Sequence, residues 1–280
     1  MAQPVYQSDY VIQKGQDLFF GAAAFAPPAT FTAKRFTTCP NAANVGGVVA
    51  TYTGYADISI TNNTTNFASA SGGEKHNLTG WQWPTNVGST SEAQAGWGLY
   101  DGANLIVVGK YTNPITIAPG QAPYVAPGHF SLTLSNTLTT PANGGEFPSN
   151  YLIAAWLDHI FGGTAYSPPA NHFLARYTVA PTAVSGSGTE AAYTAYARKS
   201  FANNLTSYAA SAAQIKKFAI DVVPTAAGSG PTLIVAWAIY DALTTGNELL
   251  VVLTKNSLSL LSGETDDIPA NALKWKLSDT

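Results

Sequence analysis

Two carboxylates recur in the same local context, and a repeated carboxylate is the first candidate for acid or base chemistry. Asp101 ends the segment that begins at Trp97, and Asp241 ends the matching segment that begins at Trp237. Acid–base work by a carboxylate needs a second group nearby with a contrasting pKa, and no second repeated Asp or Glu stands beside either aspartate. We therefore expect both aspartates to open turns after a strand, and we predict no catalytic residue.

Two arginines recur as well. Arg35 and Arg176 each stand in a strand-like segment with aromatic neighbours. An arginine stem can pack along an aromatic ring while its charged head reaches a polar group. We expect structural arginines, with the stem on Phe36 or Tyr177 or the head on a loop carbonyl. Together with the tryptophans and aspartates above, they form a repeated signature of the chain.

A tryptophan pair could bind a ligand. Trp81 and Trp83 stand two residues apart before Pro84, so in an extended segment their side chains share a face. Two exposed indoles on one face could stack on sugar rings or anchor a protein partner. The alternative is a pair of core or interface residues, and the sequence favours that alternative.

Metal and cofactor chemistry finds no support in the sequence. The chain has a single cysteine, Cys39, which cannot form a multi-thiolate site or an intrachain disulfide. The acidic segment 264–267 lacks the spacing of a calcium loop and is predicted to be a solvated turn. His159, beside Asp158, is expected to have a surface or capping role. No histidine has a partner at metal-ligand spacing; the four are His76, His129, His159 and His172.

The composition excludes two classes of partner. Of the 280 residues, 46% are hydrophobic and only 10% are charged, and the net charge is −3. Such a chain lacks the basic face that grips nucleic acid. No apolar run reaches the ~18 residues of a membrane span. The first ten residues show no secretory signal, so we expect folding in a reducing cytoplasm.

The chain repeats itself. A shift of 141 positions lays residues 17–42 on residues 158–183, with 11 of 26 positions identical. The same shift lays Tyr52 on Tyr193, and near the signature tryptophans it becomes 140. After a short insertion, residues 105–108 match residues 249–252. A register kept over this distance indicates a tandem duplication.

The duplication defines two domains and a linker. Residues 135–149 are polar and carry two prolines and two glycines, which predicts a linker. The first copy then covers residues 1–134 and the second covers residues 150–280. Each copy is large enough to hold one core.

Within each copy the sequence predicts mostly β structure. Apolar spacing predicts a helix over 150–161 and a weaker one, interrupted by Gly15, over 10–20. Segments rich in Val, Ile, Tyr, Phe and Thr follow, including one over 48–60. We predict a mainly β fold of two tandem antiparallel β-sandwich domains, each preceded by a short helix.

The second copy carries a family resemblance. It opens with Asn150-Tyr-Leu, continues through Leu157-Asp-His-Ile-Phe-Gly-Gly-Thr-Ala-Tyr-Ser-Pro-Pro-Ala170, and ends with Trp237-Ala-Ile-Tyr-Asp-Ala242. These segments resemble a family of small structural proteins of tailed bacteriophages, described as tail-fibre or minor virion proteins. The first copy shares the resemblance through the duplication. The resemblance implies no catalytic residues.

The resemblance implies a non-enzymatic virion component, assembled in the bacterial host cytoplasm. We expect it to decorate the capsid or to form part of a head or tail fibre, with other virion proteins as partners. Low charge suits surfaces buried against neighbouring subunits, so we also expect a homo-oligomer. The alternative is a module that binds host-surface glycan through Trp81 and Trp83. We expect no cofactor, nucleic acid or membrane partner.

Overall fold

The computed structural model describes residues 5–134, 146–184, 187–212, 215–219, 228, 231–270 and 274–276. Copy 1 contains a short strand, a helix and nine further strands, and its elements are β1 (Val5–Gln7), α1 (Asp9–Phe19), β2 (Thr30–Thr38), β3 (Val48–Val49), β4 (Ile58–Thr61), β5 (Glu74–His76), β6 (Trp81–Gln82), β7 (Glu92–Asp101), β8 (Asn104–Ile117), β9 (Tyr124–Val125) and β10 (Ser131–Thr133). Copy 2 repeats this plan with β11 (Glu146–Pro148), α2 (Asn150–Ile160), β12 (Asn171–Val179), β13 (Thr189–Glu190), β14 (Lys199–Ala202), β15 (Tyr208–Ala212), β16 (Ile215–Phe218), β17 (Thr232–Tyr240), β18 (Glu248–Leu260) and β19 (Lys274–Lys276).

Each copy is built on one large antiparallel sheet. The strand order is β1-β8-β7-β2-β3 in copy 1 and β11-β18-β17-β12-β13 in copy 2, and β4 and β14 pair with the same central strands. Shorter sheets, β5–β10 and β6–β9 in copy 1 and β15-β16-β19 in copy 2, supply further strands. In copy 1 the two layers meet where Trp97 of β7 contacts Trp81 of β6, with 5.4 Å between ring centroids. The prediction of a mainly β fold, with two antiparallel sheet domains and a short helix in each, is confirmed.

Three local predictions need correction. The expected strand over 48–60 is split into β3 and β4 by a turn in which the Tyr55 N–H donates to the Tyr52 carbonyl over 2.9 Å. The last residues of the expected linker are structured instead, because β11 pairs with β18 and Ser149 caps α2. The helix that contains Gly15 was expected to be the weaker one, but it is as long as the other, since α1 and α2 each span 11 residues.

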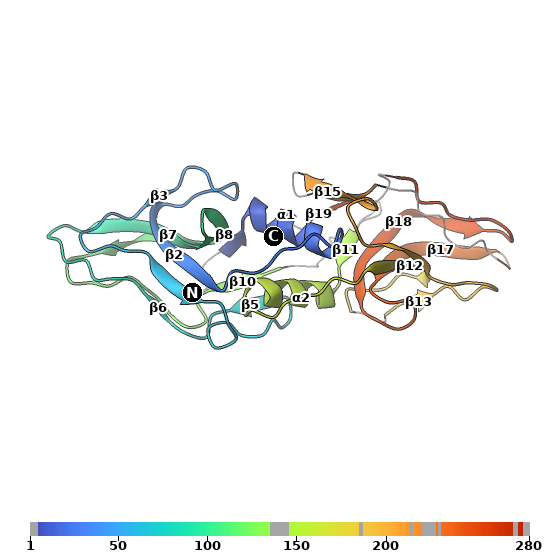
Figure 1. The fold of residues 1–280 in the computed structure, drawn as a ribbon, viewed down its shortest axis with the longest axis horizontal. Coiled ribbons are helices and arrows are strands. Elements are labelled where there is room, and N and C mark those ends of the chain that lie inside the picture. Colours follow the sequence, from blue (N-terminus) through green and yellow to red (C-terminus); the bar gives the residue numbers. More distant parts are fainter. Residues whose placement is uncertain are drawn as a thin grey trace.

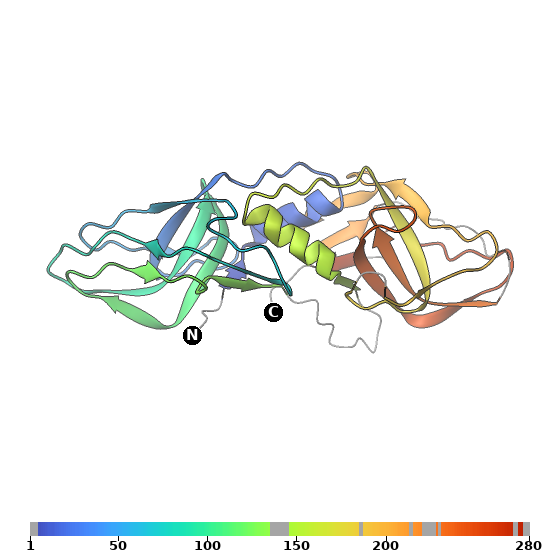
Figure 2. The same cartoon turned by 90° about the horizontal axis from the view of Figure 1, so that it is seen from below.

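The two helices lie between the two large sheets, which form opposite ends of an elongated molecule (Figure 1, Figure 2). Each helix begins at a serine whose side chain accepts a backbone N–H, from Val11 to Ser8 over 3.2 Å and from Leu152 to Ser149 over 3.1 Å. This is the usual cap for a helix start. The helix α1 packs against β15 and β16 of copy 2, and α2 packs against β5 of copy 1. Each copy therefore completes the other.

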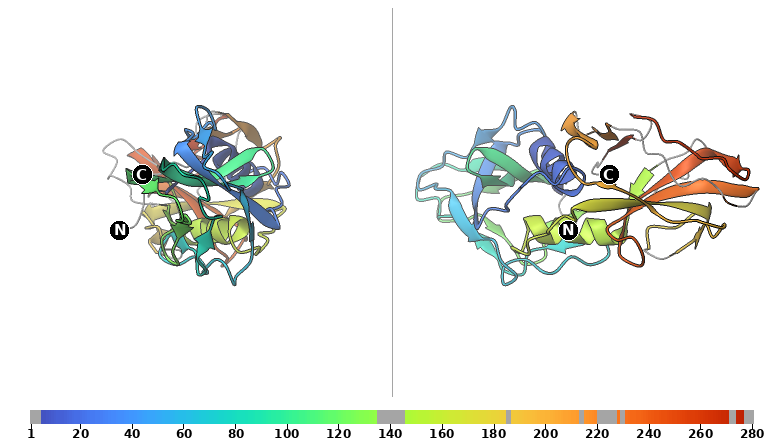
Figure 3. Two further views of the ribbon diagram at one scale, coloured as in Figure 1. Left: turned by 90° about the vertical axis from the view of Figure 1, so that its left-hand side faces the viewer. Right: turned by 45° about the vertical axis from the view of Figure 1, so that its right-hand side comes forward.

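One hydrophobic core runs through both copies. The largest cluster of buried side chains includes Phe31 and Trp97 of copy 1 together with Trp156, Leu174 and Ile239 of copy 2. The expectation of one separate core per copy is therefore wrong. The reason is the position of the helices, which lie between the two large sheets in the right-hand view of Figure 3. Their apolar side chains are buried there.

The contacts across the boundary are reciprocal. Asp158 Oδ1 accepts the Ala70 N–H over 2.8 Å, and Asp17 Oδ1 accepts the Ser211 N–H over the same distance. Both pairs are related by the shift of 141 positions. Asp158 also forms an ion pair with Lys75 over 2.6 Å, and Lys75 is only 1% exposed. The boundary thus has the character of a two-fold interface within one chain.

Amide and aromatic side chains follow the same two-fold rule. Asn62 Nδ2 donates to the Ile160 carbonyl at the end of α2 over 2.7 Å, and Asn203 Nδ2 donates to the Phe19 carbonyl at the end of α1 over 3.1 Å. These bonds satisfy carbonyls that a helix end leaves without a partner. The ring that follows each helix, Phe20 or Phe161, is fully buried. Each contacts aromatic rings of the other copy.

The two-fold rule is broken at the helix crossing. Gly15 of α1 faces Trp156 of α2, which is its counterpart under the same shift. A Cβ on Gly15 would lie 2.6 Å from the indole of Trp156, too close for a packed core. Glycine is therefore required at this crossing by close approach, and the two copies have become complementary there.

Candidate functional site

Arg35 is buried in copy 1 without a carboxylate partner among the described residues. Its Nε donates to Gln94 Oε1 over 2.7 Å, and its NH1 donates to the Tyr111 hydroxyl. The guanidinium lies over the Trp83 ring, 5.0 Å from the centroid, and burial lowers the pKa of Arg35. Phe36 points to the other face of β2 and belongs to a separate cluster. The predicted packing of the Arg35 stem on Phe36 is therefore wrong.

Arg176, the counterpart in copy 2, has a charged partner. It forms an ion pair with Asp266, and both side chains are 1% exposed. Its NH1 also donates to the Tyr193 hydroxyl, and Trp237 Nε1 donates to Asp266 Oδ2 over 2.7 Å. Asp266 was expected in a solvated turn, and that expectation is wrong. Asp266 neutralises the buried charge of Arg176, whereas Arg35 in copy 1 is held by neutral partners.

The repeated aspartates lie at hairpin turns. Asp101 ends β7 next to Gly102, whose φ is +56°. Asp241 follows β17, and its carboxylate accepts from the Asn247 N–H over 2.6 Å and from Asn247 Nδ2 over 2.8 Å. Both positions serve loop geometry.

The tryptophan pair is not exposed. Trp81 is 3% and Trp83 is 1% exposed, and both belong to the shared core. Trp83 Nε1 donates to the Ala33 carbonyl over 3.1 Å. Sugar stacking needs an accessible ring face, so these indoles lack the exposure that the glycan alternative requires of them. The core alternative describes their environment.

The expected surface role of His159 is wrong. His159 is 2% exposed, accepts the Tyr166 N–H at Nδ1 over 3.0 Å and lies 2.8 Å from the Phe25 carbonyl through Nε2. These contacts assign the proton to Nε2 and link α2 to copy 1. His172 is fully buried beside the Tyr208 hydroxyl, at 2.7 Å. Burial lowers the pKa of His159 and lowers that of His172 to about 3.

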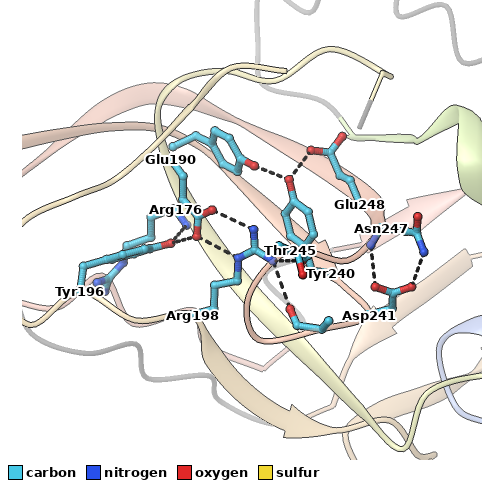
Figure 4. Close-up of polar contacts among 11 residues, drawn as sticks. Arg176, Glu190, Tyr196, Arg198, Tyr240, Asp241, Thr245, Asn247 and Glu248 are labelled. Carbon is cyan, nitrogen blue, oxygen red and sulfur yellow. Dashed lines mark hydrogen bonds and ion pairs between the residues drawn. The ribbon is translucent and has the colours of Figure 1, made fainter. Parts of the chain in front are cut away.

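A polar cluster that the sequence did not reveal lies beside the β17–β18 hairpin of copy 2 (Figure 4). Arg198 binds both oxygens of Glu190, over 2.9 and 2.8 Å. Its NH1 donates to the carbonyls of Ala242 and Thr245 over 3.1 and 2.9 Å. A bidentate arginine–carboxylate pair is geometrically specific. The pair therefore ties β13 to the hairpin loop.

Tyrosines extend the cluster on both sides. The Tyr196 hydroxyl donates to Glu190 Oε1 over 2.6 Å, and the guanidinium of Arg198 lies 3.7 Å above the Tyr240 ring. Burial alone would raise the pKa of Glu190, but the hydrogen bonds from Arg198 and Tyr196 lower it. Glu190 is therefore a carboxylate at neutral pH.

A second carboxyl group in the cluster is fully buried. Glu248 Oε2 accepts from the Tyr240 hydroxyl over 2.9 Å, and Tyr240 in turn contacts the Tyr177 hydroxyl. Burial raises the pKa of Glu248 to about 7, although Tyr240 and Arg198 act in the opposite direction. Burial favours the protonated form of Glu248, because a buried charge is poorly solvated.

Copy 1 lacks this cluster. The backbone pairing fixes the correspondence, because the Ser8 N–H donates to Ile106 and the Ser149 N–H donates to Leu249. The sequence match had placed Leu105 on Leu249, one residue out of register. The counterparts in copy 1 are Val49 for Glu190, Asp57 for Arg198, Phe36 for Tyr177 and Leu105 for Glu248.

The loop beside the cluster is longer and strained. Three residues separate Asp101 from Leu105 in copy 1, whereas six separate Asp241 from Glu248 in copy 2. Thr245 in that loop has a φ of +50°, and Ala195 has a φ of +66° where copy 1 has Gly54. A non-glycine residue in this region costs about 1 kcal/mol or more. Both residues adjoin the polar cluster: Ala195 precedes Tyr196, and the Thr245 carbonyl accepts from Arg198.

A pocket of about 550 Å³ opens beside the ion pair, between the Tyr196 segment and the hairpin loop. A smaller hollow of about 180 Å³ lies on the other side of the pair, against Tyr177 and Tyr240. Pockets of this larger size are typical of small-molecule sites. The sequence signal for this cluster is the opposite charge at matched positions of the two copies, Asp57 in copy 1 and Arg198 in copy 2.

A family model described as podophage GP4 fiber I protein gp80 matches residues 7–133 and again residues 148–276. The chain belongs to this family. The predicted resemblance to phage fibre-like virion proteins, with a duplicated domain, is thereby confirmed. A comparison with curated proteins found no match.

Membership of the fibre family makes the chain a phage structural protein and a component of the virion. One family unit corresponds to one copy, and each matched range begins beside the serine that caps the helix of that copy. The fibre-family unit thus includes the helix that packs against the other copy. In the part of the chain that the structure describes, no group of three or more His, Cys, Asp and Glu side chains could hold a metal ion. No described helix has the length and apolar character to cross a membrane.

Proposed function

We propose that this protein is a non-enzymatic fibre component of a podophage-like virion, with docking surfaces at its two ends. The observation that carries the proposal is the family match to both copies, combined with a core that joins the copies into one body. Two joined modules can contact two neighbouring subunits at once, and the second contact gains from effective concentration.

A non-enzymatic role agrees with the state of the polar groups in copy 2. Glu190 and Asp266 are each paired with an arginine, and Glu248 is bonded to Tyr240. A carboxylate paired with a guanidinium is a poor base and a poor nucleophile, because the adjacent positive charge stabilises its ionised form. These groups serve structure or binding better than turnover.

Exposed apolar side chains indicate where virion partners dock. Val45, Val48 and Val49 are 63%, 52% and 36% exposed and lie on or beside β3, which ends the large sheet of copy 1. An open sheet edge with apolar side chains readily pairs with another chain. The helix faces are already covered within the chain, so we propose that contacts with other subunits, including further copies of this chain, use the sheet edges.

Particle association tests this proposal. Purified protein should bind virions that lack it in a saturable way, and its density should appear in reconstructions of complete particles. Val48→Lys should weaken the association at least tenfold, and Thr64→Lys, at an exposed turn position outside the strands, is the control for added charge. If the density lay on the capsid and not on a fibre, the protein would be a capsid decoration protein instead of a fibre component. A stable monomer with no affinity for particles would refute both.

A further inference from the structure

One pocket of copy 2 lies against a neutralised ion pair. Its volume is about 550 Å³, and its polar wall is formed by Glu190 and Arg198. The rest of the lining is mixed: Thr244 and Thr245 are polar, and Ala191, Ala192, Ala197, Leu243 and the ring of Tyr196 are apolar. Leu243 is 50% exposed, so the apolar lining is open to a ligand from solvent.

The pocket is not needed for the fold. Copy 1 forms the same sheet with Asp57 at the position of Arg198, Val49 at that of Glu190 and a shorter hairpin. Copy 2 adds the longer loop, and Thr245 adopts a positive φ within it. A strained backbone or an added loop that the fold does not require is typical of a functional site.

The bonding capacity that remains defines the ligand. Four hydrogen bonds from Arg198 reach acceptors among the described residues, two on Glu190 and two on loop carbonyls. A guanidinium has five N–H groups, so one donor remains. Glu190 Oε2 accepts one of these bonds and a carboxylate oxygen can accept two, so one acceptor remains beside that donor.

A hydroxyl group matches this pair because it both donates and accepts. An ionic ligand gains little here, since the charges of Arg198 and Glu190 already cancel. The alanine and leucine side chains, with the ring of Tyr196, suit the C–H face of a pyranose or a methyl substituent on it. We propose that this pocket of copy 2 binds a neutral saccharide of the bacterial surface. The inference goes beyond the structural role and moves the glycan site from the buried indoles of copy 1 to copy 2.

The test compares matched substitutions in the two copies. Ala197 and Ala56 are both exposed and are related by the shift of 141 positions. The intact protein is applied to an array of neutral and acidic bacterial oligosaccharides. The best neutral binder is then measured by calorimetry against Ala197→Trp and Ala56→Trp. Ala197→Trp fills the pocket and should weaken binding at least tenfold, whereas Ala56→Trp should leave it unchanged.

Further outcomes separate the alternatives. Ala192→Trp fills the pocket from another side and repeats the test if Ala197→Trp has an altered melting curve. Binding to a neutral ligand should change less than twofold between low and high salt, because little net charge is involved. No ligand on the array, equal loss in both alanine variants, or binding restricted to acidic sugars would overturn the proposal. Particle association should persist in Ala197→Trp, so failure of this site and failure of the virion role are distinguishable.

Discussion

Copy 1 and copy 2 reach the same backbone with different chemistry in the interior. Where copy 1 buries Phe31, copy 2 buries His172 with a tyrosine hydroxyl beside it. Where copy 1 buries Leu105, copy 2 buries Glu248. The buried arginine is common to both, but Arg35 bonds Gln94 and Tyr111, whereas Arg176 bonds Asp266 and Tyr193. The comparison shows that the fold depends on the sheet and the helix exchange, while the titratable groups of copy 2 are additions to it.

The helix boundary teaches a second lesson. Its contacts are reciprocal at Asp17 and Asp158, yet complementary at Gly15 and Trp156. Two copies of copy 2 meeting through this surface would place indole against indole at the crossing. Two copies of copy 1 would leave a void there. A cavity and a clash both destabilise, so the interface favours copy 1 with copy 2.

Separating the copies should have the largest effect. We expect residues 1–134 and 135–280, produced as separate chains, to lose cooperative unfolding, because each leaves half of the shared core open to water. Mixed in equal amounts, they should form a 1:1 complex. Sedimentation velocity and circular dichroism measure both results.

Changing the helix crossing controls for that experiment. Gly15→Trp in the first half should abolish the complex, because an indole then faces Trp156. Two folded monomeric halves, or a homodimer of the second half as stable as the mixed complex, would show that the crossing does not decide the pairing.

Removing a ring from the boundary should cost less. Phe20→Ala and Phe161→Ala each delete a fully buried aromatic side chain that lies against the other copy. Each should lower the free energy of unfolding by about 3–5 kcal/mol. Urea titrations followed by tryptophan fluorescence and by circular dichroism should still coincide, because one core serves both copies. Leu205→Ala, at a side chain 47% exposed, is the control and should change stability by less than about 0.5 kcal/mol. Two separate transitions would contradict the shared core.

Much of the architecture was readable from the sequence because it depends on local patterns. The shift of 141 positions, the apolar spacing over 150–161 and the β-rich segments all survive in the structure. Along β7, Trp97 and Leu99 belong to the shared core and Tyr100 to a separate cluster, as the alternation of side chains along a strand requires. The helix interrupted by Gly15 was undervalued because its partner residue lies in the other copy.

The candidate site was not readable for a similar reason. Glu190 lies in β13, Arg198 precedes β14 and Glu248 lies in β18, and only the strand order β18-β17-β12-β13 brings them together. The sequence match also aligned Leu105 with Leu249, whereas the structure aligns Leu105 with Glu248, so the replacement of a leucine by a glutamate was missed. Hydrophobic periodicity predicts which face of a single segment is buried. It does not predict which carboxyl group forms a hydrogen bond with which hydroxyl group on another strand.

The histidine of copy 2 should make that copy sensitive to acid. The pKa of His172 falls to about 3 from 6.5, so the unfolded chain binds this proton more tightly. The stability that His172 contributes is therefore lost as the pH falls from about 6.5 toward 3, at about 1.4 kcal/mol per pH unit. His172→Phe with Tyr208→Phe recreates the Phe31–Phe67 pair of copy 1 and should remove this loss. Urea midpoints at pH 4 and pH 7 measure it; an unchanged difference between them in the double variant would contradict the assignment.

The buried carboxyl group of copy 2 should act in the opposite direction. The pKa of Glu248 is raised to about 7 from 4.5, so the folded chain binds this proton more tightly, and stability declines as the pH rises from 4.5 to 7. Glu248→Leu, which installs the residue of copy 1, should add about 3 kcal/mol at pH 8 and little at pH 4. The reciprocal Leu105→Glu should destabilise at pH 8, because the Tyr100 hydroxyl already donates to Asn44 and copy 1 has Asp57 where copy 2 has Arg198. Between pH 4.5 and 6.5 the slopes from Glu248 and His172 oppose each other, so Glu248→Leu should expose the acid sensitivity of His172. A Glu248→Leu variant with the pH profile of the unmodified protein would show that the carboxyl group titrates normally.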